Sequence, residues 1–387
     1  MQQDWFTFAG MALITGATAY ACLAACVKAR RPRIVPAQPG AQSTAVGPKG
    51  MAPQQMVLQP RAVSVFKPLC SAEPRLFENL ATLCVQTHPQ YQLLFGVRDP
   101  RDPAIAVVRV LQAAYPACDM KLVVDARVHG SNLKVSNLIN MLPHAMHDRF
   151  VIADSDIAVA PDYLEKVSAP LADPSVGIVT CLYQGRPADT FWSRLGALFI
   201  NTWFAPSVRV ASAFGSQGFG FGATIAVRRD VLMAAGGFDA LVNRLADDYW
   251  LGQLTRDLGL RTVLSEVCVI TEVTETRLSD LWAREVRWLR TIRSLNPLGF
   301  AFTWITYTFP VLAIGLALAR DRPALLLALV GALARLALHW RRLAQDAPRP
   351  GDALLAPLRD ALLLLQWCAA WLGSTVRWRQ QIMTVRT

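Results

Sequence analysis

Residues Phe150-Val-Ile-Ala-Asp-Ser-Asp156 form a short apolar run that ends in two carboxylates one residue apart. An ionised Asp is costly in the buried middle of a strand, so we expect a strand over 150–153 that leaves the core before Asp154. This places the pair at the carboxyl edge of a sheet, where open α/β sheets bind ligands. Two carboxylates so spaced can hold a divalent cation beside a nucleotide diphosphate. Asp-rich turns also occur as plain caps, so the stretch alone leaves both interpretations open.

Strand-like and helix-like segments alternate on both sides of this stretch. The expected strands cover 63–67, 92–97, 121–124, 150–153, 176–183, 219–227 and 262–264, and the expected helices cover 74–86, 103–114, 133–142 and 241–258. Alternation at this spacing predicts an α/β fold with a mostly parallel, doubly wound sheet.

The two ends of the chain are apolar enough to interact with a bilayer. Residues 5–27 carry no charge, and Lys28, Arg30, Arg31 and Arg33 follow them, which predicts an anchor with its basic flank in the cytoplasm. A cleaved signal peptide fits less well, because positive charge is missing before the run. Residues 298–319 form a second uncharged run, while 324–340 and 353–376 are interrupted by ions. The latter two are either spans with buried ions or interfacial helices.

Charge and cysteine content narrow the class of protein. The net charge of +11 comes partly from basic clusters beside apolar runs, a pattern typical of proteins on an anionic membrane leaflet. No zinc-finger spacing or RNA-binding aromatic motif accompanies them, so we expect no nucleic-acid partner. The eight cysteines form no Cys-X-X-Cys pair, which favours a reducing compartment.

Polar residues follow two other expected strands. Asp99 comes after 92–97, at the same kind of sheet edge as Asp154, and could accept hydrogen bonds from a base or ribose, or simply close a turn. Asn132 is placed to cap the helix 133–142, with Lys134 in its first turn. A cation and free backbone donors at a helix start suit a phosphate or a sugar hydroxyl, although a solvated Lys is equally compatible.

Two further clusters lie nearer the carboxyl end. Asp247 and Asp248 could favour the dipole of the helix 241–258, or one of them could remove a proton from an acceptor hydroxyl. Arg284, Arg287 and Trp288 share one helical face, where guanidiniums can pair with phosphate oxygens. A basic amphipathic helix touching the membrane is the alternative, and both can hold at once.

In this order, the clusters resemble the D, D, D, (Q/R)XXRW arrangement of inverting family 2-type glycosyltransferases, and most of all the ceramide glucosyltransferase branch, family 21. The resemblance covers about residues 62–296 and implies a glycosyltransferase type A fold, a Rossmann-like nucleotide-binding domain. Within the branch, residues 138–143 and 193–201 look most like bacterial enzymes associated with hopanoid biosynthesis. Those enzymes are expected to add N-acetylglucosamine to a hopanoid polyol.

The resemblance also implies a role for each site residue. Asp248 would be the general base; Arg284, Arg287 and Trp288 would grip the leaving diphosphate. Asp154 and Asp156 would coordinate Mg²⁺ or Mn²⁺, with Asp154 the firmer ligand because some relatives carry Gly at the second position. Asp99 would hold the uridine side of the donor, and the substrate contacts would be completed by Asn132, Lys134 and Asp247.

The resulting expectation is a metal-dependent, inverting hexosyltransferase of the inner cell membrane, multi-pass, with its catalytic domain in the cytoplasm. It would move a sugar from UDP-N-acetylglucosamine or UDP-glucose to a lipid hydroxyl, with a hopanoid polyol as acceptor, ceramide as the alternative, and the bilayer as a partner. A processive polysaccharide synthase is a further alternative, and a non-enzymatic scaffold is disfavoured because every Asp of the set is present. The expected segments are an anchor (1–31), a Pro-rich linker (32–60), a transferase domain (61–296) and membrane or interfacial helices (297–387).

Overall fold

The computed structural model describes residues 2–27, 61–343, 350–373, 375–378 and 381–384. The Pro-rich linker expected at 32–60 therefore lies outside the described residues. The chain divides into two compact units, which we call the sheet unit (Arg30–Gln184 and Ser216–Glu272) and the helical unit (Met1–Ala29, Gly185–Gly215 and Val273–Thr387).

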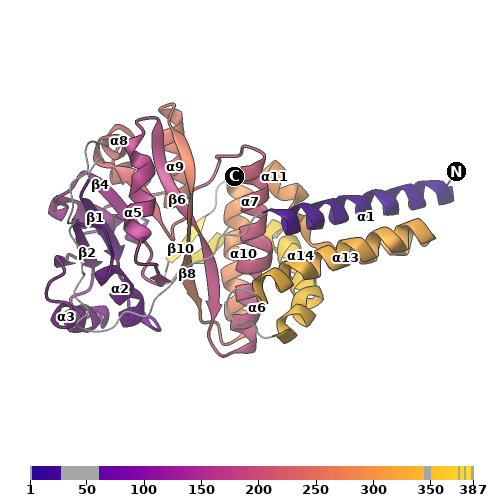
Figure 1. Cartoon of the computed structure of the whole chain (residues 1–387), viewed down its shortest axis with the longest axis horizontal. Helices are drawn as coiled ribbons and strands as arrows, with labels where there is room; N and C mark the ends of the chain where they lie inside the picture. Colours follow the sequence, from indigo (N-terminus) through magenta and orange to yellow (C-terminus); the bar gives the residue numbers. More distant parts are fainter. Residues whose placement is uncertain (1, 28–60, 344–349, 374, 379–380, 385–387) are drawn as a thin grey trace, which may run out of the picture. The chain divides into compact units, whose positions relative to one another are not determined.

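Eight described strands form one mixed sheet, labelled in Figure 1, in the order β3-β2-β1-β4-β7-β6-β8-β5. Their bounds are β1 Val63–Pro68, β2 Tyr91–Val97, β3 Met120–Val124, β4 Arg149–Ile152, β5 Ile157–Ala158, β6 Val176–Pro187, β7 Ile225–Arg228 and β8 Arg261–Val273. The first four strands in this order pair in parallel. The pairs β4–β7, β6–β7 and β5–β8 are antiparallel, so the expectation of a mostly parallel sheet is wrong for its second half.

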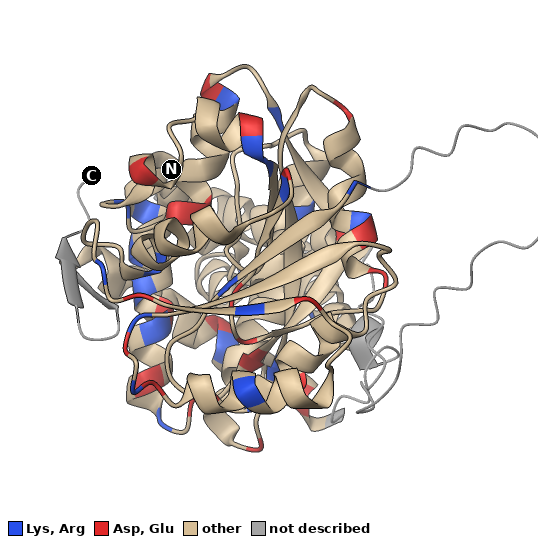
Figure 2. Cartoon of the chain, turned by 90° about the vertical axis from the view of Figure 1, so that its left-hand side faces the viewer, with Lys and Arg blue, Asp and Glu red and all other residues tan. Residues whose placement is uncertain are grey.

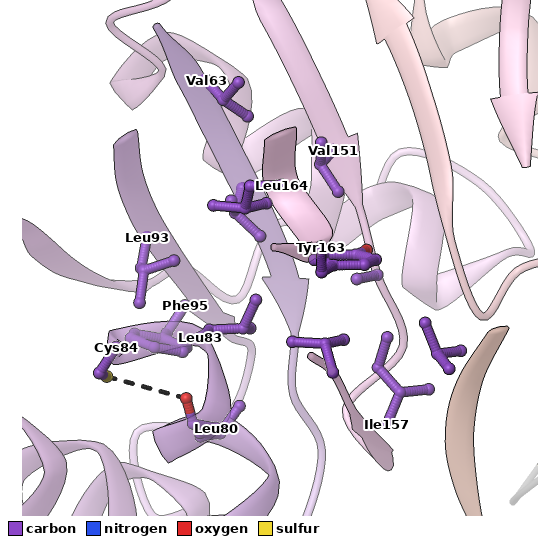
Figure 3. Packing of buried hydrophobic residues seen from close by; sticks show 14 of the residues in the cluster. Val63, Leu80, Leu83, Cys84, Leu93, Phe95, Val151, Ile157, Tyr163 and Leu164 are labelled. Atoms are coloured by element: carbon purple, nitrogen blue, oxygen red, sulfur yellow. Dashed lines mark hydrogen bonds between the residues drawn. The ribbon is translucent and has the colours of Figure 1, made fainter. Parts of the chain in front are cut away.

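Alternating side chains of the strands build a core on each face of the sheet, because successive residues of a strand point to opposite sides. Val63, Val65 and Val151 belong to one cluster, shown in part in Figure 3. Phe66 and Phe150 belong to the other, with ring centroids 5.1 Å apart. Figure 2 shows Lys, Arg, Asp and Glu mainly on helices and loops, while the strands are largely without them.

Helices contribute to both clusters, which confirms the doubly wound arrangement. The first cluster contains residues of α2 Leu76–Cys84, α3 Ala104–Ala114 and α5 Tyr163–Ser168. The second contains residues of α4 Leu133–Met141, α8 Arg229–Ala234 and α9 Asp247–Asp257. The expected helix over 241–258 is therefore too long at its start: residues Phe238–Leu241 form a separate 3₁₀ turn, and α9 begins only at Asp247.

The helical unit contains α1 Gln2–Cys26, α6 Phe191–Phe199, a π-helical turn Ile200–Phe204, α7 Ala205–Ala213, α10 Leu278–Leu295, α11 Pro297–Phe302, α12 Thr308–Leu318, α13 Arg322–Leu343 and α14 Ala356–Trp371. Two short strands, β9 Thr375–Trp378 and β10 Gln381–Thr384, form an antiparallel pair. Ile14 of α1 packs with Val311 of α12 and Ala328 of α13 in one apolar cluster.

Three described helical segments are long and apolar enough to cross a membrane: Asp4–Cys26, Arg322–His339 and Gly351–Trp371. The run 298–319, expected to span as one helix, is instead broken into Pro297–Thr306 and Thr308–Leu318, with a bend of 73°. Pro310 explains the break, because proline has no N–H for the carbonyl of Thr306 and its ring would clash there. The ions expected to interrupt the other segments, Arg335, Arg359 and Asp360, are buried inside the unit.

Candidate active site

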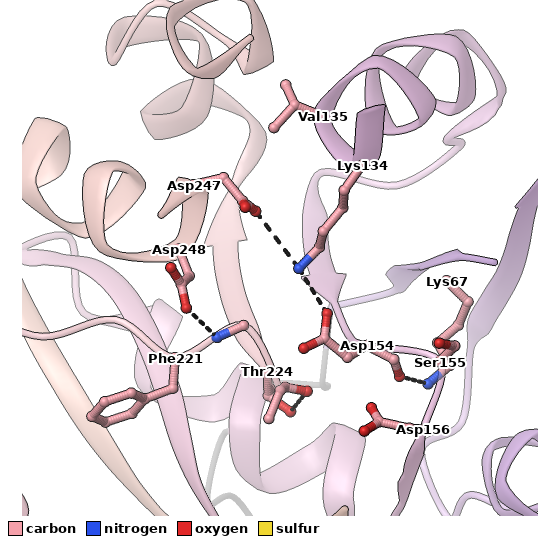
Figure 4. Close-up of polar contacts among 12 residues, drawn as sticks. Lys67, Lys134, Val135, Asp154, Ser155, Asp156, Phe221, Thr224, Asp247 and Asp248 are labelled. Carbon is pink, nitrogen blue, oxygen red and sulfur yellow. Dashed lines mark hydrogen bonds and ion pairs between the residues drawn. The ribbon is translucent and has the colours of Figure 1, made fainter. Parts of the chain in front are cut away.

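The end of β4 delivers Asp154 to the sheet edge, as expected from the sequence. The strand ends at Ile152, and the backbone oxygen of Asp154 accepts a hydrogen bond from Nζ of Lys67, near the end of the neighbouring strand β1. Lys67 is fully buried, and this burial lowers its pKa to about 8. A buried ammonium thus holds the turn that presents the carboxylate of Asp154 (Figure 4).

Asn132 caps helix α4, which confirms that part of the prediction. Its side-chain oxygen accepts hydrogen bonds from the backbone N–H groups of Lys134 and Val135, at 3.0 and 3.1 Å. Its Nδ2 donates to the backbone oxygen of Arg244 at 2.8 Å and to Oδ1 of Asp247 at 3.2 Å. The amide of Asn132 therefore joins the start of α4 to the start of α9.

Lys134 lies between two of the expected site carboxylates. Its Nζ is 2.7 Å from Oδ1 of Asp154 and 3.6 Å from Oδ2 of Asp247 (Figure 4). Burial alone would lower the pKa of Lys134, but attraction to Asp154, Asp247 and Asp248 outweighs it and raises that pKa. Lys134 is a permanent cation in a cluster of three carboxylates.

Asp248 is held at the first turn of α9 by backbone donors. Its Oδ2 accepts from the N–H of Gly222 at 2.7 Å, and its Oδ1 accepts from the N–H of Tyr249 at 2.8 Å. Burial, and then the charge of Asp247, raise the pKa of Asp248 to about 6. A carboxylate with such a pKa is ionised near neutral pH and still basic enough to take a proton.

Gly222 is the point on which these groups converge. A Cβ placed there would lie 3.2 Å from Oδ2 of Asp154 and 3.3 Å from both Oδ2 of Asp248 and Nζ of Lys134. Any side chain at 222 would therefore occupy space between the charged groups. An apolar wall that includes Leu138, Ile152 and Leu251 lines the adjoining pocket and accounts for the desolvation of Asp248.

Asp156 has different surroundings from Asp154. Its Oδ2 accepts a hydrogen bond from Oγ1 of Thr271 at 2.7 Å. Burial, and then the charge of Asp154, raise the pKa of Asp156 to about 6.

The donor set fits a Mg²⁺ or Mn²⁺ ion that is shared with a substrate. Among the described residues, no three His, Cys, Asp or Glu side chains are grouped so as to hold a metal ion by themselves. Mg²⁺ usually binds through one or two carboxylates and completes its shell with phosphates and water. Asp154 and Asp156 can supply those carboxylates.

Asp99 follows β2, as expected, but its carboxylate contacts no residue of the cluster around Lys134. Its side chain is 52% exposed and pairs with Arg101 at 3.3 Å. Hydrogen bonds from the backbone and side chain of Arg101 lower the pKa of Asp99. The residue presents an ionised oxygen pair at the sheet edge.

Arg284, Arg287 and Trp288, which we call the basic motif, lie on helix α10 of the helical unit. Arg284 pairs with Glu275, and its guanidinium lies 5.1 Å from the ring centroid of Trp288. Nε and Nη2 of Arg284 are buried and donate no hydrogen bond to the described residues. Trp288 packs against Phe199, with ring centroids 5.5 Å apart. Arg287, one turn from Arg284, completes the motif face of α10.

A family model described as glycosyl transferase family 21 matches residues 13–387 of the chain. The chain belongs to glycosyl transferase family 21. This confirms the family inferred from the order of the motifs.

Curated relatives of this family-21 chain include ceramide glucosyltransferases 3 and 1 of Caenorhabditis elegans. Both are 23% identical to it, over 59% and 61% of the chain, respectively. The matches span about half the length of each relative. A mannosyltransferase from Pyrobaculum calidifontis, solved in complex with GDP-Man and Mn²⁺, has a similar fold, with a TM-score of 0.52 and 20% identity. That likeness covers 96% of this chain and 98% of the other and confirms the glycosyltransferase type A fold.

Sequence reasoning left two site residues of this family-21 chain without a role. Lys67 lies in an apolar strand. A buried strand tolerates a Lys only if the ammonium finds a partner, so its presence there indicates a polar contact at the end of the strand. Gly222 lies in the Gly-rich run 215–222, whose composition is compatible with close backbone approach to a ligand or with a flexible loop. Its position against Asp248 depends on the antiparallel pairing of β7, which no local pattern predicted.

Proposed function

We propose that this family-21 glycosyltransferase moves a sugar from a UDP-sugar to the hydroxyl of a membrane lipid. The single observation that carries the proposal is the placement of Asp248, a desolvated carboxylate fixed beside the Lys134–Asp154 pair. The family and the ceramide glucosyltransferases among its relatives support a lipid acceptor.

The reaction is a single displacement at the anomeric carbon of the sugar. The acceptor hydroxyl oxygen forms the new bond to this carbon, the bond from the carbon to the diphosphate oxygen breaks with both electrons, and UDP leaves. Asp248 takes the hydroxyl proton. Attack opposite to the leaving group inverts the configuration.

Asp248 is better suited to this role than Asp247. Both oxygens of Asp247 are already engaged, one by Asn132 and the other by Lys134. Among the described residues, Asp248 accepts hydrogen bonds from backbone N–H groups alone, and burial raises its pKa to about 6. These contacts support the assignment of Asp248, and not Asp247, as the general base.

The remaining residues prepare the donor. Asp154, with Asp156 as the second carboxylate, would hold Mg²⁺ or Mn²⁺, whose charge offsets that of the diphosphate. Asp99 would accept hydrogen bonds from the uridine. Nε and Nη2 of Arg284 are buried and donate no hydrogen bond to the described residues, although Nη2 lies 3.8 Å from Oε1 of Glu285, and both could donate to phosphate oxygens. Arg287 and Trp288 share the helix of Arg284.

The acceptor proposed from the sequence is a hopanoid polyol, with N-acetylglucosamine as the sugar. The names of the relatives favour ceramide and glucose instead. The proposed topology places the sheet unit in the cytoplasm of a cell with an inner membrane, where UDP-sugars are available.

To test this proposal, membranes that contain the protein are incubated with one donor, UDP-glucose or UDP-N-acetylglucosamine, and with one acceptor, ceramide or bacteriohopanetetrol. Mass spectrometry of the extracted lipids identifies both substrates. We expect one lipid to gain one sugar, and Asp248→Asn membranes to lose the product while still binding UDP-sugar. Neither lipid gaining a hexose or N-acetylhexosamine would contradict the proposal.

A further inference from the structure

Helix α14 carries two adjacent ions, Arg359 and Asp360, although its composition is that of a membrane-crossing helix. Their exposed fractions are 0% and 1%, so neither reaches solvent. Ions buried in an apolar helix are costly and are retained where they have specific partners. The two ions have different partners.

Both Nη atoms of Arg359 donate hydrogen bonds, which link it to helix α10, while its buried Nε donates none to the described residues. Its Nη2 and Nη1 donate to the two carboxylate oxygens of Glu285, at 2.9 and 3.2 Å. Gln366, about two turns further along α14, accepts from Nη2 of Arg359 at 2.8 Å and donates to Glu285 at 2.8 Å. Nη1 of Arg359 also donates to the backbone oxygen of Leu195 in α6, at 3.3 Å.

Asp360 connects helix α14 to helices α13 and α12. Its carboxylate pairs with Arg335 of α13, at 2.7 and 3.0 Å, and accepts from the N–H of Phe309 at the start of α12, at 3.3 Å. The second helix of the broken segment 297–318 is α12, and the carboxylate of Asp360 therefore accepts a hydrogen bond from the first turn of this helix. Asp360 has no contact of this kind with α10 among the described residues.

Glu285 occupies a particular place in α10, between Arg284 and Arg287 of the basic motif. Consecutive helix residues are rotated by about 100°, so fixing the Glu285 side chain against α14 fixes the direction of its neighbours. A bidentate guanidinium–carboxylate pair constrains both distance and rotation, which an apolar contact of equal area does not. The network thus acts on the orientation of α10 about its own axis.

We propose that Arg359, assisted by Gln366, is a positioning residue that sets the rotation of α10 through Glu285, and with it the orientation of Arg284, Arg287 and Trp288. The inference rests on the proposed function for its link to catalysis. Helix α14 would then hold the basic motif in the orientation that binds the leaving diphosphate.

The decisive variant replaces the whole network by apolar side chains, Glu285→Leu with Arg359→Met and Gln366→Leu. Arg284 then loses the carboxylate of Glu285, 3.8 Å away, but keeps its ion pair with Glu275. Such replacements of buried ion pairs often preserve stability. In full-length protein in lipid nanodiscs, we expect the thermal midpoint to be kept while kcat falls by about ten- to a hundredfold and KM for the UDP-sugar changes little. Wild-type kcat in a folded triple variant would overturn the proposal.

The matched control removes the other ion pair of α14, by Arg335→Met with Asp360→Leu. This pair does not touch α10, so we expect kcat within about twofold of the wild-type value. An equal loss of kcat in both variants would assign the effect to α14 as a whole and overturn the specific role of Arg359.

Hydrogen exchange of residues 278–295 gives a readout that needs no substrate. Arg359→Lys keeps the charge but cannot form the fork to Glu285, so we expect faster exchange in α10 and unchanged exchange in α1. Unchanged exchange in α10 would overturn the positioning role. Wild-type protein that glycosylates no lipid would refute the proposed function alone, and the exchange result would still decide whether Arg359 positions α10.

Discussion

Nζ of Lys134 lies 2.7 Å from Oδ1 of Asp154 and so places a fixed positive charge among the carboxylates at the edge of the sheet. The same ammonium attracts Asp247 and lowers the pKa of Asp248 from the value it would otherwise have. One lysine at the start of α4 therefore influences both the proposed metal ligand and the proposed base.

Lys134→Met should shift the pH dependence of transfer. Loss of the ammonium raises the pKa of Asp248 further above about 6, so the base becomes protonated at a higher pH. We expect the acidic limb of the kcat profile to move upward by about one pH unit, together with a lower maximum. Initial rates between pH 5 and 9 at saturating substrates measure this shift.

Two substitutions serve as controls for Lys134. Lys134→Arg keeps the charge and should leave the acidic limb near the wild-type position, even if geometry lowers the rate. Lys166→Met removes an exposed lysine whose partner is Asp162 and should leave the whole profile unchanged. An unshifted limb in Lys134→Met would show that the ammonium does not control the base.

Gly222→Ala should impair the reaction more than the fold. The added Cβ would lie 3.2 to 3.3 Å from Asp154, Asp248 and Lys134, which must each move by a few tenths of an ångström. Displacements of this size among reacting groups cost about tenfold or more in kcat. Steady-state kinetics with a thermal melt separates the two effects, and a melt shifted strongly with kcat retained would contradict the assignment.

The matched control is Gly218→Ala, in the same loop. Its added Cβ meets no atom within 4 Å, and its backbone needs no left-handed conformation. We expect both kcat and the thermal midpoint of this variant to equal those of the wild type.

Gly10→Ala should loosen the packing of α1 on α12. The new Cβ would lie 2.6 Å from the backbone oxygen of Gly315 and 2.8 Å from the backbone N of Ala319, so the helices must separate. Small residues allow close helix approach in membranes, and overpacking costs typically 1–3 kcal/mol. A lower midpoint of unfolding in detergent checks this, and Gly351→Ala, whose Cβ meets nothing within 4 Å, is the neutral comparison.

The parts predicted well from sequence are those governed by local chemistry. The strand ending before Asp154 follows from the cost of burying a carboxylate, and the Asn132 cap follows from its side-chain geometry. The antiparallel half of the sheet was missed because residue alternation is the same in both strand directions. The break at Tyr307 was missed because the hydropathy of 298–319 obscured the helix-breaking effect of Pro310.

Asp156→Asn should stabilise the metal-free protein at neutral pH. Burial and Asp154 raise the pKa of Asp156 from 3.8 to about 6 in the folded state, so its ionisation disfavours folding. For a raised pKa the stabilising proton is present below about pH 4 and is lost as the pH rises through about 6. The Asn side chain never ionises, and Thr271 can accept a hydrogen bond from its amide.

The expected gain is about 1 to 3 kcal/mol above pH 6 and close to zero below pH 4, since each pKa unit corresponds to about 1.36 kcal/mol. Thermal midpoints of wild type and variant, measured with a chelator at pH 4 and pH 7.5, give the comparison. Addition of Mg²⁺ or Mn²⁺ with UDP should then stabilise the wild type more than the variant, because the variant lacks one carboxylate ligand. A gain independent of pH would show that the carboxylate of Asp156 is not desolvated, and equal stabilisation by metal and UDP would remove Asp156 from the proposed metal site.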